Sequence, residues 1–173
     1  MLKGSKKGYV KKKSQILIKN FHPSIIAPIS NSILRKFITD VMNGEDCKSF
    51  NIDVNLVENA VIRKINRKFL KHNNYTDIIT FPYSTKKSGF IEGELFISMD
   101  EVKRNSLIFK DSFKNEFSRV IIHGCLHLAG FNDRTKKQKE LIREKENFYL
   151  MKQRKNNVIR KSTRNNSAAA FGT

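Results

Sequence analysis

The stretch that most limits what this chain can fold into is an apolar helical segment, residues 113–129, that carries two histidines. Apolar side chains fall on two opposite sides of the predicted helix, so both sides are expected to be buried. His123 and His127 lie four residues apart, about one helical turn, so their rings share one face. The sequence therefore predicts a central, buried helix that presents two imidazoles along one flank.

A glycine and a carboxylate follow the second histidine. Gly130 is suited to end the helix in the left-handed conformation, after which the chain can turn back and bring Asp133 toward the histidines. Two imidazole nitrogens and one carboxylate oxygen, with a fourth position left for water, form the ligand pattern of a catalytic zinc site. We expect His123, His127 and Asp133 to hold one Zn²⁺. The motif alone also fits a buried helix whose histidines hydrogen-bond to their neighbours.

The donor set points to hydrolysis as the reaction class. Zinc lowers the pKa of its bound water toward ~7 and polarises carbonyl or phosphoryl oxygens. In the zinc-protease motif His-Glu-x-x-His a glutamate follows the first histidine, and here that position is Gly124, which counts against peptide hydrolysis. Glu116 lies about 10 Å along the helix from His123 and is too far to share the ion. Beyond the ion's water, the pattern singles out no catalytic or substrate-binding side chain.

Charge is concentrated at the two ends of the chain. The formal net charge is +18, yet residues 21–150 contribute only about +5, because all sixteen acidic residues lie among them. We predict a flexible basic arm over residues 1–14, one domain over residues 15–150, and a basic, disordered tail over residues 151–173. Basic ends favour a polyanionic partner, nucleic acid ahead of a membrane surface, although tails that only keep the protein in solution would have the same composition.

Cysteine content and hydropathy bear on the compartment. Cys47 and Cys125 are too few for a disulfide framework and favour a reduced, cytoplasmic setting. No apolar run reaches the ~18 residues of a membrane span. The apolar run after the basic N-terminal stretch is too short for a signal peptide. The sequence leaves the oligomeric state open.

Residue patterns along the chain predict strands alternating with helices. Alternating or β-branched runs predict four strands, over residues 16–18, 50–56, 77–82 and 92–97, the last two forming a hairpin. Apolar residues at helical spacing predict five helices, over residues 25–41, 59–70, 98–109, 113–129 and 135–150. Ser98 and Thr135 have the side chains that cap the start of two of these helices.

Three blocks of this sequence resemble the signature of a known family. They are the run from His123 to Asp133, the residues from Ile65 to Phe81, and Gly93 to Ser98. Their order and spacing are similar to those of the YbeY family, metal-dependent endoribonucleases also described as rRNA maturation factors. The resemblance implies an α/β fold of the α+β kind, in which about five helices flank a small mixed four-stranded sheet and a central buried helix carries the metal ligands. It also implies a zinc ion and a role in ribosomal RNA processing and late ribosome assembly.

Two positions depart from the family pattern. Asp133 stands where the family commonly has a third histidine, and a carboxylate is a good zinc ligand. Leu70 aligns with a position at which the family commonly has an arginine. Any RNA-phosphate contact from that arginine must come from elsewhere in this chain. Arg67, Lys71 and Arg119 are candidates, and each is equally well explained as an ordinary solvated charge.

Three polar residues of the second block keep two interpretations. Asn66, Thr76 and Asp77 either serve the cleft around the ion or only cap and turn the chain. Their side chains suit both roles, because short polar groups bond readily to nearby backbone. We therefore assign none of them to the site.

Together these patterns predict a cytoplasmic, single-strand-specific, metal-dependent endoribonuclease that acts in rRNA maturation and late ribosome assembly. Its partners are RNA and the ribosomal subunit, with no membrane association, and its basic ends hold the RNA backbone with an affinity that falls with salt. An alternative is a non-catalytic, RNA-binding ribosome-assembly factor with a structural zinc. A third interpretation, a degenerate zinc protease, has Gly124 against it.

Overall fold

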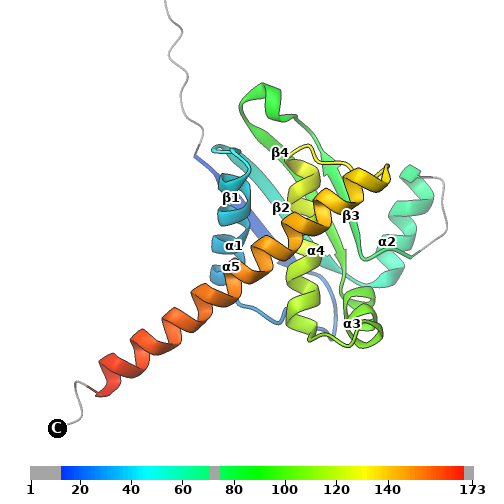
Figure 1. Cartoon of the computed structure of the whole chain (residues 1–173). Coiled ribbons are helices and arrows are strands. Elements are labelled where there is room, and N and C mark those ends of the chain that lie inside the picture. Colours follow the sequence, from blue (N-terminus) through cyan, green and yellow to red (C-terminus); the bar gives the residue numbers. More distant parts are fainter. Residues whose placement is uncertain (1–12, 71–74, 170–173) are drawn as a thin grey trace, which may run out of the picture.

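The computed structural model describes residues 13–70 and 75–169, and within them a four-stranded sheet packs with five α-helices (Figure 1). The strands are β1 (Gln15–Asn20), β2 (Phe50–Val57), β3 (Ile78–Pro82) and β4 (Ile91–Ser98). They stand in the order β1-β2-β4-β3. Neighbours pair in parallel except β3, which runs antiparallel to β4. The predicted hairpin and mixed sheet are confirmed.

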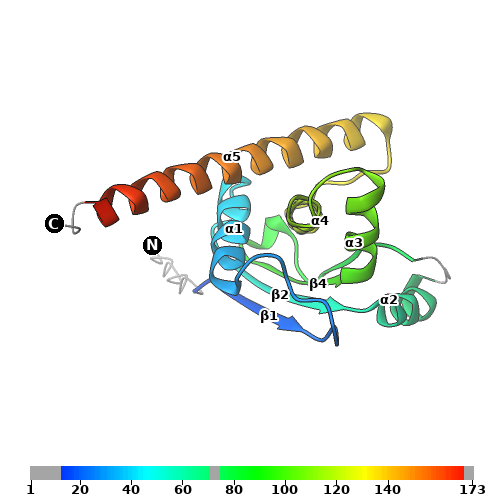
Figure 2. The same cartoon turned by 90° about the horizontal axis from the view of Figure 1, so that it is seen from below.

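Four of the five helices lie in two layers over one face of the sheet, and the second helix packs against β3 on the other face. The helices are α1 (Asn31–Gly44), α2 (Asn59–Ile65), α3 (Met99–Ile108), α4 (Phe113–Leu128) and α5 (Lys136–Ala169). Seen from below, α1, α3 and α4 lie next to the strands, and α5 crosses over α1 and α4 on the outside (Figure 2). Helix α4 thus has the sheet on one side and α5 on the other, which confirms the predicted central buried helix.

Helix α4 can approach the sheet closely because Gly124 has no side chain. A Cβ built on Gly124 would lie 2.5 Å from the Cδ1 of Ile78 and 2.9 Å from the Cδ2 of Leu95. Gly93 on β4 is crowded in the same way, 2.5 Å from the Cδ2 of Leu128. The glycine in the position of the zinc-protease glutamate therefore faces the sheet, and its small size is required by packing.

Capping residues fix where the helices around the site begin. The Ser98 hydroxyl accepts a hydrogen bond from the Glu101 amide at 3.2 Å at the start of α3. Before α5, the Gln138 amide donates to the Thr135 hydroxyl at 3.2 Å, while the Gln138 side-chain oxygen accepts from the Thr135 amide at 3.0 Å. Both predicted caps are confirmed, the second as a complete capping box.

Two element boundaries differ from the sequence-based prediction. Helix α1 begins at Asn31 and not near residue 25, because Pro28 disfavours helical backbone in the residue before it. The helix predicted over residues 59–70 is α-helical only to Ile65. It finishes as a π-helical turn, η1 (Asn66–Leu70).

Helix α5 continues to Ala169, beyond Met151, from which the sequence-based prediction was disorder. Residues 151–169 contain no glycine or proline and several good helix formers, so nothing in them ends the helix. Most of the predicted N-terminal arm, residues 1–12, lies outside the described residues. Within residues 13–70 and 75–169, no helix combines the length and the apolar character needed to span a bilayer.

Candidate metal centre

The two histidines of α4 turn their rings toward one point. The Nε2 atoms of His123 and His127 are 2.9 Å apart, and the ring planes are inclined at 74°. A tetrahedral zinc ion with nitrogen ligands at about 2.0–2.1 Å holds those nitrogens about 3.3 Å apart, which a small rotation of either ring provides. The spacing of four residues predicted this convergence, and the structure has it.

The end of α4 is built to bring the chain back. Gly130 has φ +97°, and its amide bonds to the His127 carbonyl at 3.0 Å, while the Phe131 amide bonds to the Leu126 carbonyl at 3.0 Å. This pair of bonds is the Schellman motif that follows many helices. The reversal places the Oδ2 of Asp133 3.9 Å from the Nε2 of His127.

The three predicted residues therefore form one group. One ligand atom from each of His123, His127 and Asp133 lies within 4.8 Å of the other two. Among the described residues, this is the one group of three or more His, Cys, Asp or Glu side chains close enough to hold a metal ion together. All three are partly exposed, so an ion and a substrate can reach them. Two neutral nitrogens and one carboxylate oxygen fit a divalent metal such as zinc.

Glu146, which the sequence analysis did not single out, holds the first histidine in place. Its Oε1 lies 2.8 Å from the Nδ1 of His123, and Glu146 is 8% exposed. An imidazole that donates from Nδ1 to a carboxylate keeps the lone pair of Nε2 for a metal. Glu146 shares a helical face with the buried residues Ile142 and Tyr149. The sequence offered one signal for Glu146, an acidic residue on the apolar face of a predicted amphipathic helix.

Arg119 closes the network behind Glu146. Its guanidinium donates to the Oε2 of Glu146 at 3.3 Å, and it lies 3.8 Å from the carboxylate of Glu116. The same group donates to the Oδ1 of Asn147 at 3.3 Å. Arg119 thus ties α4 to α5 through Glu116, Glu146 and Asn147. Burial raises the pKa of Glu116, which stands outside the ligand group as predicted.

The two histidines differ in proton affinity. Burial lowers the pKa of His123, but the hydrogen bond and charge of Glu146 outweigh burial, and its pKa is raised. Burial, with the charge of His123, lowers the pKa of His127. The contact with Glu146 therefore helps to shift the pKa values of two rings on the same helix in opposite directions. His127 is the neutral ring, ready to accept a cation, near pH 7.

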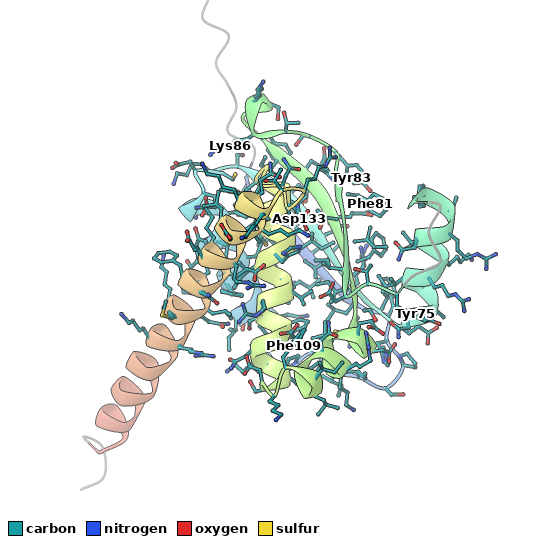
Figure 3. All side chains as sticks on the ribbon, turned by 45° about the vertical axis from the view of Figure 1, so that its right-hand side comes forward. Tyr75, Phe81, Tyr83, Lys86, Phe109 and Asp133 are labelled. Carbon is teal, nitrogen blue, oxygen red and sulfur yellow. The ribbon has the colours of Figure 1, made fainter. Side chains whose placement is uncertain are left out.

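A cleft opens beside His127. It has a volume of about 300 Å³ and is lined by Thr80, Pro82, Ser84, Thr85, Lys86, His127, Leu128, Gly130, Phe131 and Asn132. Its walls are the loop after α4 and the β3–β4 hairpin, and Figure 3 shows Lys86 and Tyr83 on that hairpin and Asp133 on the loop. The cleft adjoins the metal group through His127, which belongs to both.

Asn66, Thr76 and Asp77, for which the sequence left two interpretations, do not line this cleft. The Thr76 hydroxyl donates to the Ile78 carbonyl at 3.3 Å, a local turn. The Asp77 carbonyl accepts from the Ser98 amide at 2.9 Å, and the Asp77 carboxylate lies near enough to raise the pKa of His123. Asn66 is 3% exposed at the start of η1.

Of the other candidates, Arg67 is exposed on η1, and Lys71 lies outside the described residues. Cys125, between the histidines in sequence, points into the core, where burial raises its pKa to about 12. It is therefore an inert thiol and not a fourth ligand. Cys47 is also buried, and both are free.

Comparison with known proteins places this geometry in a family. Residues 19–154 match the family model described as Endoribonuclease YbeY. Curated proteins named Endoribonuclease YbeY are similar to the chain. The protein from Chlorobium phaeovibrioides is 41% identical over 68% of this chain and 78% of its own length. Those from Chloroherpeton thalassium and Azobacteroides pseudotrichonymphae are 43% and 40% identical, over 68% and 72% of this chain and 82% and 88% of their own lengths.

A solved structure shares the fold. The solution structure of TM1509 from Thermotoga maritima aligns with a TM-score of 0.58 over 80% of this chain and 89% of that chain, at 24% identity. That likeness supports the α+β architecture. The family model covers most of the chain, and relatives about 40% identical span at least two thirds of it. The chain therefore belongs to the endoribonuclease YbeY family.

Proposed function

We propose that the endoribonuclease activity of this chain works at one zinc ion held by His123, His127 and Asp133. The observation that carries the proposal is the convergence of two imidazole nitrogens and a carboxylate at the mouth of a cleft. When bound, the ion supplies positive charge to a phosphoryl oxygen and makes a water molecule more acidic.

The residues around the ligands set up this chemistry. Glu146 fixes the His123 ring through a 2.8 Å contact, so its metal-binding nitrogen stays aimed at the ion position. The low pKa of His127 keeps that ring unprotonated. Lys86, on the cleft wall, offers a positive charge to a phosphate that enters the cleft. We propose single-stranded RNA as the substrate.

We further propose that the substrate is ribosomal RNA, processed during maturation and late ribosome assembly in the cytoplasm. The relatives' name supports the activity, and a net charge of +18 suits a polyanionic assembly as partner. Two free thiols suit a reducing compartment. Residues 15–150 form the catalytic domain in this proposal, since Leu150 is the last core residue among the side chains that the structure describes.

The test measures metal content and cleavage in the same preparations. Wild-type protein is expected to carry about one zinc per chain and to cut single-stranded rRNA fragments. His127→Ala and Asp133→Ala are expected to lose both metal and cleavage. Asp46→Ala, which removes an exposed carboxylate, is the control and should keep both. If His127→Ala cuts as fast as wild type, with contaminating nuclease excluded, the proposal is wrong.

Chelation separates a catalytic ion from a structural one. Removing the metal is expected to abolish cleavage while circular dichroism retains the helical signal, because the core is built without the ion. Returning zinc should restore the activity. If chelation unfolds the chain, and the zinc-loaded protein binds RNA without cutting it, the metal is structural and the chain acts as an assembly factor.

A further inference from the structure

A second hollow of the described surface lies away from the metal group, on α2 and η1. It has a volume of about 800 Å³ and is lined by Ala60, Arg63, Lys64, Arg67, Lys68 and Tyr75. We call it the α2 groove. Four of its six lining residues are cations and none is acidic. Its chemistry is therefore that of a site for a polyanion.

The packing of α2 turns these cations outward. Ile62 is fully buried and, with Val61 and Ile65, packs against Ile79 and Phe81 of β3. The opposite side of the helix is left to two pairs of cations at a spacing of four residues, Arg63 with Arg67 and Lys64 with Lys68. This side of α2 is therefore uniformly positive.

Like charges at this spacing destabilise a helix in the absence of an anion. On α1, by contrast, the same spacing pairs opposite charges, with the Nζ of Lys36 3.0 Å from the Oδ2 of Asp40. An ordinary solvated helix face mixes signs as α1 does. The uniform sign on α2 is relieved when phosphates bind between the cations.

Exposed aromatic rings stand among the cations. Tyr75 is 50% exposed and the Arg63 guanidinium lies 5.7 Å from its ring centre, while Phe69 is 58% exposed with the Lys68 ammonium 5.1 Å from its ring centre. Cations interleaved with open aromatic faces are the means by which proteins bind single strands, because bases stack on the rings while the cations follow the backbone.

Strand β3 connects the α2 groove with the metal side. Thr80 and Pro82 line the cleft beside His127. Phe81, between them in sequence, points to the other face of the sheet and meets the Phe69 ring at 5.6 Å. Figure 3 shows Phe81 and Tyr75 on the side of the sheet that carries α2. Edge strand β3 and the helix α2 packed on it therefore lie between the two hollows.

We propose that the α2 groove binds single-stranded RNA, with phosphates on Arg63, Lys64, Arg67 and Lys68 and a base on Tyr75, and that it holds the segment flanking the one in the cleft. The inference rests on the proposed function in taking RNA as substrate. It adds a site outside the metal centre that sets how tightly, and with which polarity of strand, the RNA is held.

The experiment measures RNA binding in a His127→Ala background, in which the strand is not consumed. The probe is a fluorescent 20-nucleotide single-stranded RNA, and the readout is anisotropy across a salt series. Arg67→Glu with Lys68→Glu is expected to weaken binding at least about tenfold. It should also reduce the slope of log affinity against log salt by about 1.4, because two phosphate contacts are lost.

A matched pair of substitutions controls for net charge. Lys139→Glu with Arg143→Glu changes the same residue types by the same charge on exposed positions of α5, outside the basic tail. This control is expected to weaken binding no more than about threefold. Equal losses in the two double variants would overturn the proposal, because they would show that only overall charge matters.

Tyr75 tests the stacking contact. Tyr75→Ala is expected to weaken single-strand binding about tenfold with little change in the salt slope, and Tyr75→Phe should restore the affinity. A duplex RNA of the same sequence should bind Tyr75→Ala and its parent equally. This inference would be overturned if the α2-groove variants bound RNA as tightly as their parent. It would also be overturned if they lost binding to an acidic protein while their RNA affinity stayed the same. The proposed endoribonuclease function is tested separately, by cleavage in the protein that keeps His127.

Discussion

At the residue scale, the candidate metal centre depends on a side chain that cannot itself reach the ion. Glu146→Gln keeps the size of the side chain but accepts more weakly from the His123 ring, 2.8 Å away in the wild type. We expect metal affinity to fall about 10–100-fold, the usual effect of losing a carboxylate behind a ligating histidine. Titration with zinc against a competing chelator measures it. Glu144→Gln, exposed on the same helix, should leave the affinity unchanged.

Gly124→Ala tests the close approach of α4 to the sheet. In an open helix this substitution stabilises by about 1 kcal/mol. Here the added Cβ would lie 2.5 Å from the Cδ1 of Ile78, so we expect destabilisation of about 1–3 kcal/mol. Urea denaturation measures whether the substitution raises or lowers the free energy of unfolding. A more stable variant would show that the helix and sheet have room to spare.

Local spacing was enough to predict some residues of the site and not others. His123, His127, Gly130 and Asp133 fall within eleven positions, so helix geometry alone brings them together. Glu146 comes twenty-three residues after His123 and joins it only because α5 folds back over α4. The packing angle between two helices decides which of their residues face each other. Local sequence patterns do not give that angle.

At the scale of elements, a buried polar cluster fastens α5 to α1. The Tyr149 hydroxyl donates to the Oε1 of Glu45 at 2.7 Å, and the Lys145 ammonium contacts both Glu45 oxygens at 2.9 and 2.8 Å. Tyr149→Phe removes one of these bonds, and we expect a loss of about 1 kcal/mol in the free energy of unfolding at neutral pH. Thermal and urea denaturation measure the loss.

The same substitution predicts a pH dependence. Burial raises the pKa of Tyr149, and the hydrogen bond to Glu45 and its charge raise it further. The folded state thus holds the phenol proton more tightly than the unfolded state. The resulting stability is complete below the ordinary tyrosine pKa of about 10 and declines as pH rises above it. Wild type should therefore lose its advantage over Tyr149→Phe as the pH rises above about 10, and a constant difference would contradict this.

Strand and helix positions were largely predictable because apolar periodicity is a local property. The strands, the hairpin and α3 to α5 begin within a few residues of the predicted positions. The start of α1 was predicted too early because Ile29 continues the helical spacing, although it is buried from an irregular segment after Pro28. Periodicity reports burial and cannot distinguish a helix from a loop that packs against the same core.

At the scale of the whole molecule, the charge at the two ends predicts how a shortened chain behaves. A chain of residues 13–155 loses eight basic residues and keeps every described side chain of the core. We expect it to retain zinc and to unfold within a few degrees of the full chain. Its RNA affinity at low salt should fall, with a smaller salt slope. Loss of zinc on shortening would contradict the assignment of residues 15–150 as the catalytic domain.

The crossing of α5 over α4 bears on the order in which the protein becomes competent during its synthesis. A nascent chain that has emerged as far as Asp133 already exposes all three ligand side chains, but the acid that orients the first of them is still inside the ribosome. The contact between Glu146 and the His123 ring therefore forms only after the last helix has docked on α4.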